Sequence, residues 1–384
     1  MNSRERVLKA LDHEEPDRVP LILGGTQSGI TKVAYNNLAK YLGLKVRELP
    51  IECRCQQLVD PEEEVLKRLG IDFRTVTYYG GPTKKWKNIE YPDDSFRDEW
   101  GIRWKRPLGG HWYDMVEHPL ANADVEDLDE YNWPDPRDPG RTEGLEKRAK
   151  ELYEHTDYAL AIGMPMYGMT FERAWYLRGY VKWITDLHQN PKFATCLLDK
   201  LVELSLRFYD EILSAVGDYI QVVNVGDDLG EQNGPIISLD LYRRMIKPWQ
   251  AKLYRFIKCK TDAKLSYHGC GSMYAFINDL IDIGVDILNP VQPTAAGMGD
   301  PERLKHEFGD RICFLGGVCT QRVLPFGTSD DVRAEVEKRI RGLAPKGGYV
   351  LGAVHNIQPE VKPENMVAMY ESALRYGRYP LELR

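Results

Sequence analysis

Several features of the sequence are absent, and each absence excludes a class of protein. The apolar runs are of strand length, far below the roughly 18 residues that span a bilayer, which argues against a membrane protein. Lysine and arginine number 51 against 58 acidic residues, and no basic cluster occurs. A chain with net charge -7 gives no electrostatic reason to expect nucleic acid or an anionic membrane as a partner.

Nucleotide-binding and secretion signals are also missing. No GxGxxG or Walker loop follows any predicted strand, which weakens a dinucleotide or nucleotide site. The first residues, MNSRERVLKALDHEEPDRVP, are charged throughout and lack the apolar region of a signal peptide. The seven cysteines are scattered and odd in number, unlike a small disulfide scaffold. We therefore expect a cytoplasmic protein with free thiols.

What is present is an alternation of strand-like and helix-like segments over 384 residues. Eight apolar runs are predicted to be strands: Asp17–Gly25, Phe73–Thr77, Tyr158–Ile162, Tyr219–Val225, Lys264–Tyr267, Val285–Leu288, Ile312–Leu315 and Tyr349–Leu351. Helical patterns are predicted between them, among them Asn2–His13, Pro191–Val216, Ser238–Lys260, Met273–Gly284 and Ser329–Leu343, the last with a serine N-cap.

Near-continuous apolar strands that alternate with helices indicate a parallel sheet covered on both faces. Eight such units favour a closed (β/α)8 TIM-type barrel over an open doubly wound sheet. The exception is the region from Gly80 to about Arg141, rich in Pro, Asp, Trp and Tyr. We interpret it as an insertion after the second strand, a β-hairpin and loop over the barrel mouth. Residues 1–384 are expected to form one domain.

In such a barrel the active site lies at the carboxyl ends of the strands. The fifth strand leads into His268 and Cys270, which stand one residue apart and are flanked by Gly269 and Gly271. In a strand, residues i and i+2 point to the same side, so an imidazole and a thiolate would converge there. The pair predicts part of a zinc site, although an isolated pair of this kind is often an ordinary buried contact.

A catalytic zinc site commonly has three protein ligands and an open position. His355, directly after the last strand, is the preferred third ligand. Cys319, a few residues into the loop after the seventh strand, is the alternative. A centre with no third protein ligand also stays open.

Other polar residues follow the predicted strand ends. We predict that Asp227 binds substrate or orients a metal-bound histidine, although a double aspartate also commonly caps a helix. Glu172 is the candidate general acid. An ordinary glutamate at the surface or at the start of a helix is an equally weighted alternative. Further candidates for substrate contact are Gln232, Asn289, Gln292, Met164 and Tyr167, with core filling as the alternative for the methionine.

The order of several motifs resembles the uroporphyrinogen decarboxylase superfamily. The matching stretches are ALDHEEPDRVP with RVPLILGG, then HGCG, ILNPVQP, GDRICFLGGV and HNIQPEVKPEN. The resemblance extends from about Arg4 to the C-terminus and implies a (β/α)8 barrel. One branch contains cofactor-free decarboxylases of tetrapyrrole synthesis. The other contains zinc-dependent methyltransferases of corrinoid systems, whose methyl group passes between a small substrate, a cobalamin-carrying protein and an acceptor.

The resemblance distinguishes the two branches in part. The decarboxylases carry an arginine-rich signature after the first strand, where this chain has Gly24-Gly25-Thr26-Gln27-Ser28-Gly29 and no arginine. The methyltransferases bind zinc through an HxC pair after strand five, matched by His268 and Cys270, and a third ligand near the end of strand eight. That third position is usually cysteine in members that methylate thiols, whereas here it is His355.

The resemblance thus implies an O-demethylase type of methyltransferase that acts on a small methoxylated or methylated compound. Because no DxHxxG motif occurs, the cobalamin is expected on a partner protein. A metal-free lyase and a non-enzymatic corrinoid- or tetrapyrrole-binding protein are the alternatives. A homo-oligomer is compatible with the sequence but not indicated by it.

Overall fold

A seven-stranded parallel sheet forms the centre of the computed structural model, which describes residues 1–76, 82–83, 86–166 and 168–381. The strand order is β14-β13-β12-β11-β10-β9-β4, so neighbours in sequence are neighbours in the sheet. The bounds are β4 Phe73–Val76, β9 Ala159–Ile162, β10 Val222–Gly226, β11 Lys264–His268, β12 Ile287–Asn289, β13 Cys313–Val318 and β14 Tyr349–Ala353. The predicted TIM-like α/β barrel is confirmed.

The first predicted strand is not a regular strand, and this part of the prediction is corrected. Its segment instead bridges the two edges of the sheet: the Ile22 N–H donates to Leu351 O (3.1 Å), and the Asp72 N–H donates to Leu21 O (2.9 Å). Pro20 has no N–H to donate to a ladder, and the chain turns away at Gly24, where φ is +135°. An irregular segment therefore completes the barrel.

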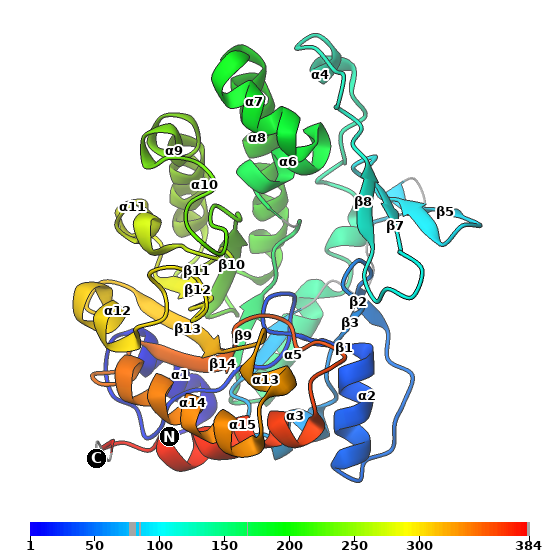
Figure 1. Cartoon of the computed structure of the whole chain (residues 1–384). Helices are drawn as coiled ribbons and strands as arrows, with labels where there is room; N and C mark the ends of the chain where they lie inside the picture. The colour runs from blue at the N-terminus through cyan, green and yellow to red at the C-terminus, as the bar shows by residue number, and fades with distance from the viewer. Residues whose placement is uncertain (77–81, 84–85, 167, 382–384) are drawn as a thin grey trace.

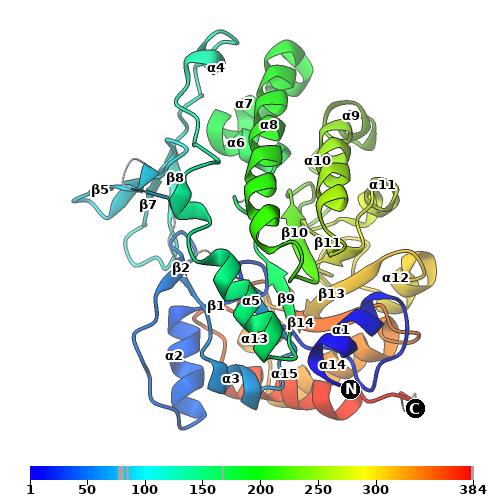
Figure 2. The ribbon, with the colours of Figure 1, turned by 180° about the vertical axis from the view of Figure 1, so that it is seen from behind.

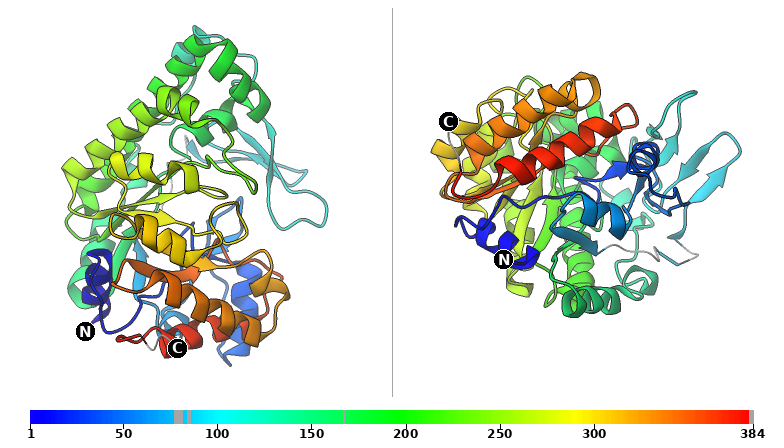
Figure 3. Two further views of the ribbon diagram at one scale, coloured as in Figure 1. Left: turned by 60° about the vertical axis from the view of Figure 1, so that its left-hand side comes forward. Right: turned by 90° about the horizontal axis from the view of Figure 1, so that it is seen from below.

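Helices cover the outside of the barrel. Their bounds are α1 Ser3–Leu11, α2 Lys32–Tyr41, α3 Glu63–Arg68, α5 Leu145–His155, α6 Phe171–Arg178, α7 Tyr180–Gln189, α8 Pro191–Val216, α9 Leu239–Met245, α10 Lys247–Lys260, α11 Ile277–Asp282, α12 Pro301–Phe308, α13 Val323–Phe326, α14 Ser329–Leu343 and α15 Pro363–Tyr376, with 3-10 turns η2 Pro139–Arg141 and η3 Tyr274–Phe276. The long helix α8 packs beside α10 (Figure 2), and α14 runs beside α15 (Figure 3).

Three helix predictions need correction in detail. The segment Ser238–Lys260 is broken at Ile246, because Pro248 cannot continue the hydrogen-bond pattern of the preceding turn and instead lies in the first turn of α10, which begins at Lys247. The segment Met273–Gly284 begins as a 3-10 turn before α11. The N-cap of α14 is Thr328 rather than Ser329, because the Thr328 and Asp331 side chains form a reciprocal capping box.

The insertion after β4 contains a four-stranded antiparallel sheet, more than the single hairpin expected. Its strands are β5 Ile89–Tyr91, β6 Ser95–Arg97, β7 Arg103–Lys105 and β8 Asp114–Glu117, followed by the short helix α4 Asp127–Glu130. This sheet projects to one side of the barrel (Figure 1). A second small sheet, unpredicted, joins β1 Ile30–Thr31, β2 Ile51–Cys53 and β3 Leu58–Val59.

The apolar core fills the barrel and the spaces beneath its helices. Asp72 is a fully buried charge among these elements, and it accepts hydrogen bonds from Arg6, Arg18 and the Leu21 N–H. It ties the N-terminal helix and the irregular first segment to β4. In the part of the chain that the structure describes, no helix is long and apolar enough to cross a membrane.

Candidate metal centre

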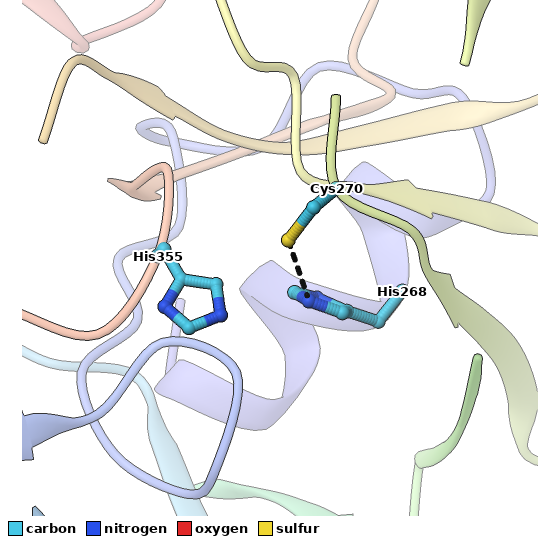
Figure 4. Close-up of side chains that lie close together, drawn as sticks. All are labelled: His268, Cys270 and His355. Carbon is cyan, nitrogen blue, oxygen red and sulfur yellow. Dashed lines mark hydrogen bonds between the residues drawn. The ribbon is translucent and has the colours of Figure 1, made fainter. Parts of the chain in front are cut away.

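Three metal-capable side chains meet at the carboxyl end of the barrel. His268 is the last residue of β11, Cys270 follows it by two residues, and His355 follows the end of β14 by two. One ligand atom from each lies within 4.8 Å of the others. The Cys270 Sγ is 3.4 Å from His268 Nε2, and the two imidazole centroids are 5.4 Å apart. Figure 4 shows the three side chains pointing toward one another.

The orientation of His268 is fixed by Asn289 at the end of the adjacent strand β12. The Asn289 Oδ1 lies 2.6 Å from His268 Nδ1. Because an amide oxygen only accepts, Nδ1 carries the proton and the lone pair of Nε2 points toward Cys270. This is the arrangement in which a histidine binds a metal through Nε2 while its other nitrogen is held.

The loop that carries Cys270 is held by backbone hydrogen bonds from two sides. The Cys270 N–H donates to Asp228 Oδ1 (2.7 Å), and the Gly271 N–H donates to Gln292 Oε1 (2.8 Å). Gly271 has φ +80°, and a Cβ there would lie 2.7 Å from the Glu231 carbonyl oxygen. The glycine after the cysteine is therefore required by the turn.

The charge states of the three side chains depend on their burial. Burial, with the neighbouring His268, lowers the pKa of His355 to about 3, so its imidazole is neutral and free to bind a cation. Burial and the carboxylates of Asp228 and Glu172 raise the pKa of the Cys270 thiol well above its usual range. A metal cation would reverse this effect on the thiol, because thiolate is the form that binds metal.

The donor set fits zinc. Zinc takes nitrogen and sulfur ligands, with Zn–N near 2.0–2.1 Å and Zn–S near 2.3 Å, which in a tetrahedron places N and S about 3.6 Å apart. The observed separation between Cys270 Sγ and His268 Nε2 is 3.4 Å. Cys319 is buried after β13 and does not belong to this group. Among the described residues, no other set of three His, Cys, Asp or Glu side chains converges in this way.

Two cavities meet at the centre, and His355 lines both. One has a volume of about 230 Å³ and also contains His268, Glu172, Asp228 and Met164. The other has a volume of about 580 Å³ and is lined by Cys270, His355 and several carboxamide side chains, among them Gln232 and Gln292.

Glu172 lies near the start of α6 and faces the smaller cavity. Its carboxyl group accepts a hydrogen bond from the Tyr176 hydroxyl, one helical turn later. Burial, and next the charge of Asp228, raise the pKa of Glu172 to about 8. Glu172 therefore holds a proton at neutral pH.

Asp227 is buried behind the cavity walls. Its carboxylate accepts hydrogen bonds from five donors: Met169 N, Thr170 N, Thr170 Oγ1, Glu172 N and Gln250 Nε2. It lines neither of the two cavities at the centre, whereas the adjacent Asp228 lines the smaller one. The carboxylate thus anchors the turn that precedes Glu172.

The remaining predicted residues are spread over the centre. Asn289 contacts His268, Gln292 supports Gly271, and Gln232 contacts Gln292 (3.4 Å) and the Thr294 carbonyl. Tyr167 lies outside the described residues. Tyr176 was not predicted, although its spacing of four from Glu172 places the two on one helix face. Nothing in the sequence pattern connects Trp104 or Cys55, which also line the smaller cavity, with the centre.

Fold and site together define a TIM-like barrel protein with a candidate three-ligand metal centre at the carboxyl ends of its strands. The family model for uroporphyrinogen decarboxylase (URO-D) matches residues 114–376. The chain therefore belongs to the uroporphyrinogen decarboxylase family, which confirms the resemblance in its motifs.

Curated relatives are distant and differ in activity. A "uroporphyrinogen decarboxylase" of Pelodictyon phaeoclathratiforme is 24% identical over 48% of this chain and 50% of its own length. The "methylcobamide:CoM methyltransferase MtaA" of Methanosarcina barkeri is 24% identical over 52% of this chain and 53% of its own length. The chain thus matches about half the length of each of these two relatives.

Among solved structures, a "methyltransferase from Methanosarcina mazei" matches with a TM-score of 0.66 and 20% identity, over 98% of this chain and 99% of that one. At this identity the likeness establishes the shared fold.

Proposed function

We propose that the protein is a zinc-dependent methyltransferase of a corrinoid system, of the O-demethylase type. The observation that carries the proposal is the convergence of His268, Cys270 and His355 at the barrel mouth. The similarity to a methylcobamide methyltransferase supports it. In the reaction proposed, the O–CH₃ bond breaks with its electron pair left on oxygen, and the methyl group passes to the reduced cobalt of a partner's cobalamin.

Zinc bound by one thiolate and two neutral imidazoles would act as a Lewis acid toward the substrate oxygen, more strongly than zinc bound by several thiolates. The protein's part is to hold the three ligands in place. Asn289 orients His268, while Asp228 and Gln292 fix the loop of Cys270.

Glu172 is proposed as the general acid. Its carboxyl group is protonated at neutral pH, faces the smaller cavity and is positioned by Tyr176. It would give its proton to the oxygen as the O–CH₃ bond breaks. Asp227 is proposed as a positioning residue, since its five hydrogen bonds hold the turn before Glu172.

We assign the larger cavity to the corrinoid partner. Its wall carries five carboxamide side chains: Gln232, Gln292, Gln321, Gln358 and Asn356. No lysine or arginine is among its described lining residues. A corrin ring bears amide side chains around its rim, which carboxamides can match by hydrogen bonds. The methyl group to be transferred then faces the smaller cavity, where Met164 is a wall residue. A substrate role for Tyr167 stays a prediction, as does a cytoplasmic location.

Decarboxylation of a porphyrinogen is the second candidate, because other relatives carry that name. Such a substrate carries many carboxylates, which need cationic partners. Neither cavity at the centre has an arginine or lysine among its described lining residues. The charge of the site therefore favours methyl transfer from a small donor.

Zinc content and methyl transfer to cob(I)alamin should be measured together. Wild-type protein is expected to contain one zinc and to transfer methyl groups, and His268→Ala, Cys270→Ala and His355→Ala are each expected to lose both properties. Stoichiometric zinc in all three variants would show that these residues do not form the zinc site. Activity that resists chelators would favour the metal-free lyase, and cobalamin binding without any transfer would favour a corrinoid-binding protein.

A further inference from the structure

A third cavity lies between the barrel mouth and the insertion, and it has no role in the centre described above. Its volume is about 440 Å³. It shares five lining residues with the cavity of His268 and His355, so the two adjoin: Thr26, Cys55, Trp104, Met164 and Tyr176. Its far wall is made by β2 and by the insertion around β6.

The wall of this cavity is rich in aromatic rings and methionine. It includes Phe96, Trp86, Trp100, Trp104 and Tyr176, with Met164 and Met166 beside them. The Phe96 and Trp104 rings lie 6.4 Å apart and nearly parallel, and Trp104 meets the Tyr176 ring edge-on at 6.0 Å. Such surfaces favour a flat ring, because rings stack and sulfur packs against them. The carboxamide-lined cavity has no aromatic ring other than that of His355 among its described lining residues.

Most charges on this wall are already paired. Arg54 is bound to Glu90, and Arg141 to Glu99. Asp98 accepts hydrogen bonds from the Trp104 indole and from two backbone N–H groups.

Glu52, on β2, differs from these. Its Oε2 is buried and has no hydrogen-bond partner among the described residues. Burial, together with the nearby Asp60, raises the pKa of Glu52 to about 8. A buried polar atom without a partner is costly, and this one is on a residue that lines an aromatic cavity.

We propose that this cavity binds the ring of an aromatic methyl ether that carries a ring hydroxyl, with Glu52 as the hydrogen-bond partner of that hydroxyl. The methoxy group then faces the shared wall at Met164 and Tyr176 and points toward the metal centre. The orientation of the methoxy group toward the metal centre rests on the proposed methyl transfer. The binding of the ring does not require the metal.

Binding should be measured by calorimetry on chelator-treated protein with three ligands of similar size: 4-methoxyphenol, methoxybenzene and cyclohexyl methyl ether. We expect 4-methoxyphenol to bind most tightly and the cyclohexyl ether to bind up to roughly tenfold more weakly than methoxybenzene, through loss of stacking. Equal affinities for cyclohexyl methyl ether and methoxybenzene would overturn the assignment of this cavity to an aromatic ring.

The role of Glu52 is tested by Glu52→Leu, with Glu52→Gln as the conservative variant. Glu52→Leu should lower the affinity for 4-methoxyphenol by up to roughly tenfold, the effect of one hydrogen bond, and leave that for methoxybenzene unchanged. Glu52→Gln, which keeps a hydrogen-bonding group, should restore most of the loss. Equal losses for both ligands would overturn the role of Glu52 as the polar contact.

A matched control is Glu337→Leu on the outer face of α14, where Glu337 pairs only with Arg341 in the described contacts. It should bind all three ligands as the wild type does. Failure of the two proposals is distinguishable. Ring binding without methyl transfer would refute the function and keep the cavity assignment, whereas methyl transfer from methanol or other non-aromatic donors without ring binding would refute the cavity assignment alone.

Discussion

The Nδ1 atom of His268 lies 2.6 Å from Oδ1 of Asn289, so the last residue of β11 is oriented by the last residue of β12. The two strands are paired in parallel with these residues in register. The hydrogen bond therefore follows from the barrel itself, and it leaves Nε2 facing Cys270. Both residues belong to rigid strands, which suits a site that must hold a metal with fixed geometry.

Asn289→Ala should weaken zinc binding without removing a ligand. Loss of such a hydrogen bond to a metal-bound histidine typically lowers metal affinity 10–100-fold. We expect a shift of this size in a competition titration with a chromophoric chelator. Asn278→Ala, on α11, is the control, because that side chain contacts only Arg311 in the described contacts. Unchanged zinc affinity in Asn289→Ala would mean that the bond does not orient the ligand.

Asp227→Ala should destabilise the fold and disturb Glu172. Five donors would lose their acceptor inside the protein, at a cost of about 3 kcal/mol or more. Urea denaturation should show this loss, and the exposed Asp218→Ala should not. If Asp227→Ala kept full stability and lost only substrate affinity, Asp227 would be a substrate ligand, as the sequence led us to expect.

The sequence predicted the barrel and the metal ligands because both depend on local patterns. Apolar runs mark buried strands, and a parallel barrel brings all strand ends to one rim. This is why His268, Cys270 and His355 could be brought together before their distances were known. His355 was preferred over Cys319 because it follows the last strand directly, and the family resemblance agrees with that position.

What the sequence could not give was the set of partners that each polar residue finds. Asp227 receives hydrogen bonds from residues more than fifty positions earlier and from Gln250, so its buried role follows from tertiary contacts alone. The contact of the Asn289 oxygen with His268 was not expected from the sequence, and a substrate contact of Asn289 stays a prediction. The irregular first segment also depends on tertiary contacts, since Pro20 and the glycines interrupt a run whose apolar pattern is that of a strand.

Glu172 should impose a pH dependence on stability. Its folded-state pKa is raised to about 8, whereas an unfolded glutamate has a pKa near about 4.3. Between these values the folded protein keeps a proton that the unfolded chain has lost, so this group's contribution to the free energy of unfolding falls as pH rises through the window. Glu172→Gln removes that contribution.

Urea denaturation of chelator-treated protein at several pH values across this window tests the effect. The variant should lose stability less steeply with rising pH than the wild type. The control Glu337→Gln should follow the wild-type profile, because that side chain is half-exposed on α14. Parallel profiles for Glu172→Gln and the wild type would show that the Glu172 carboxyl is ionised in the folded protein.

Gly226→Ala should damage the metal centre through a single methyl group. Gly226 ends β10 and is paired in register with His268. A Cβ at Gly226 would lie 2.4 Å from the His268 carbonyl oxygen and 3.0 Å from its Cβ. Contacts under 3.0 Å with backbone force a shift, so β11 must move away from β10 at the residue that carries a ligand. Overpacking of this kind costs about 1–3 kcal/mol, and zinc content should fall with it.

Gly163→Ala, after the neighbouring strand β9, is the matched control, because a Cβ there meets nothing within 4 Å. It should keep both its stability and its zinc. If Gly226→Ala lost stability but bound zinc as tightly as the wild type, the position of His268 would not depend on the spacing between β10 and β11.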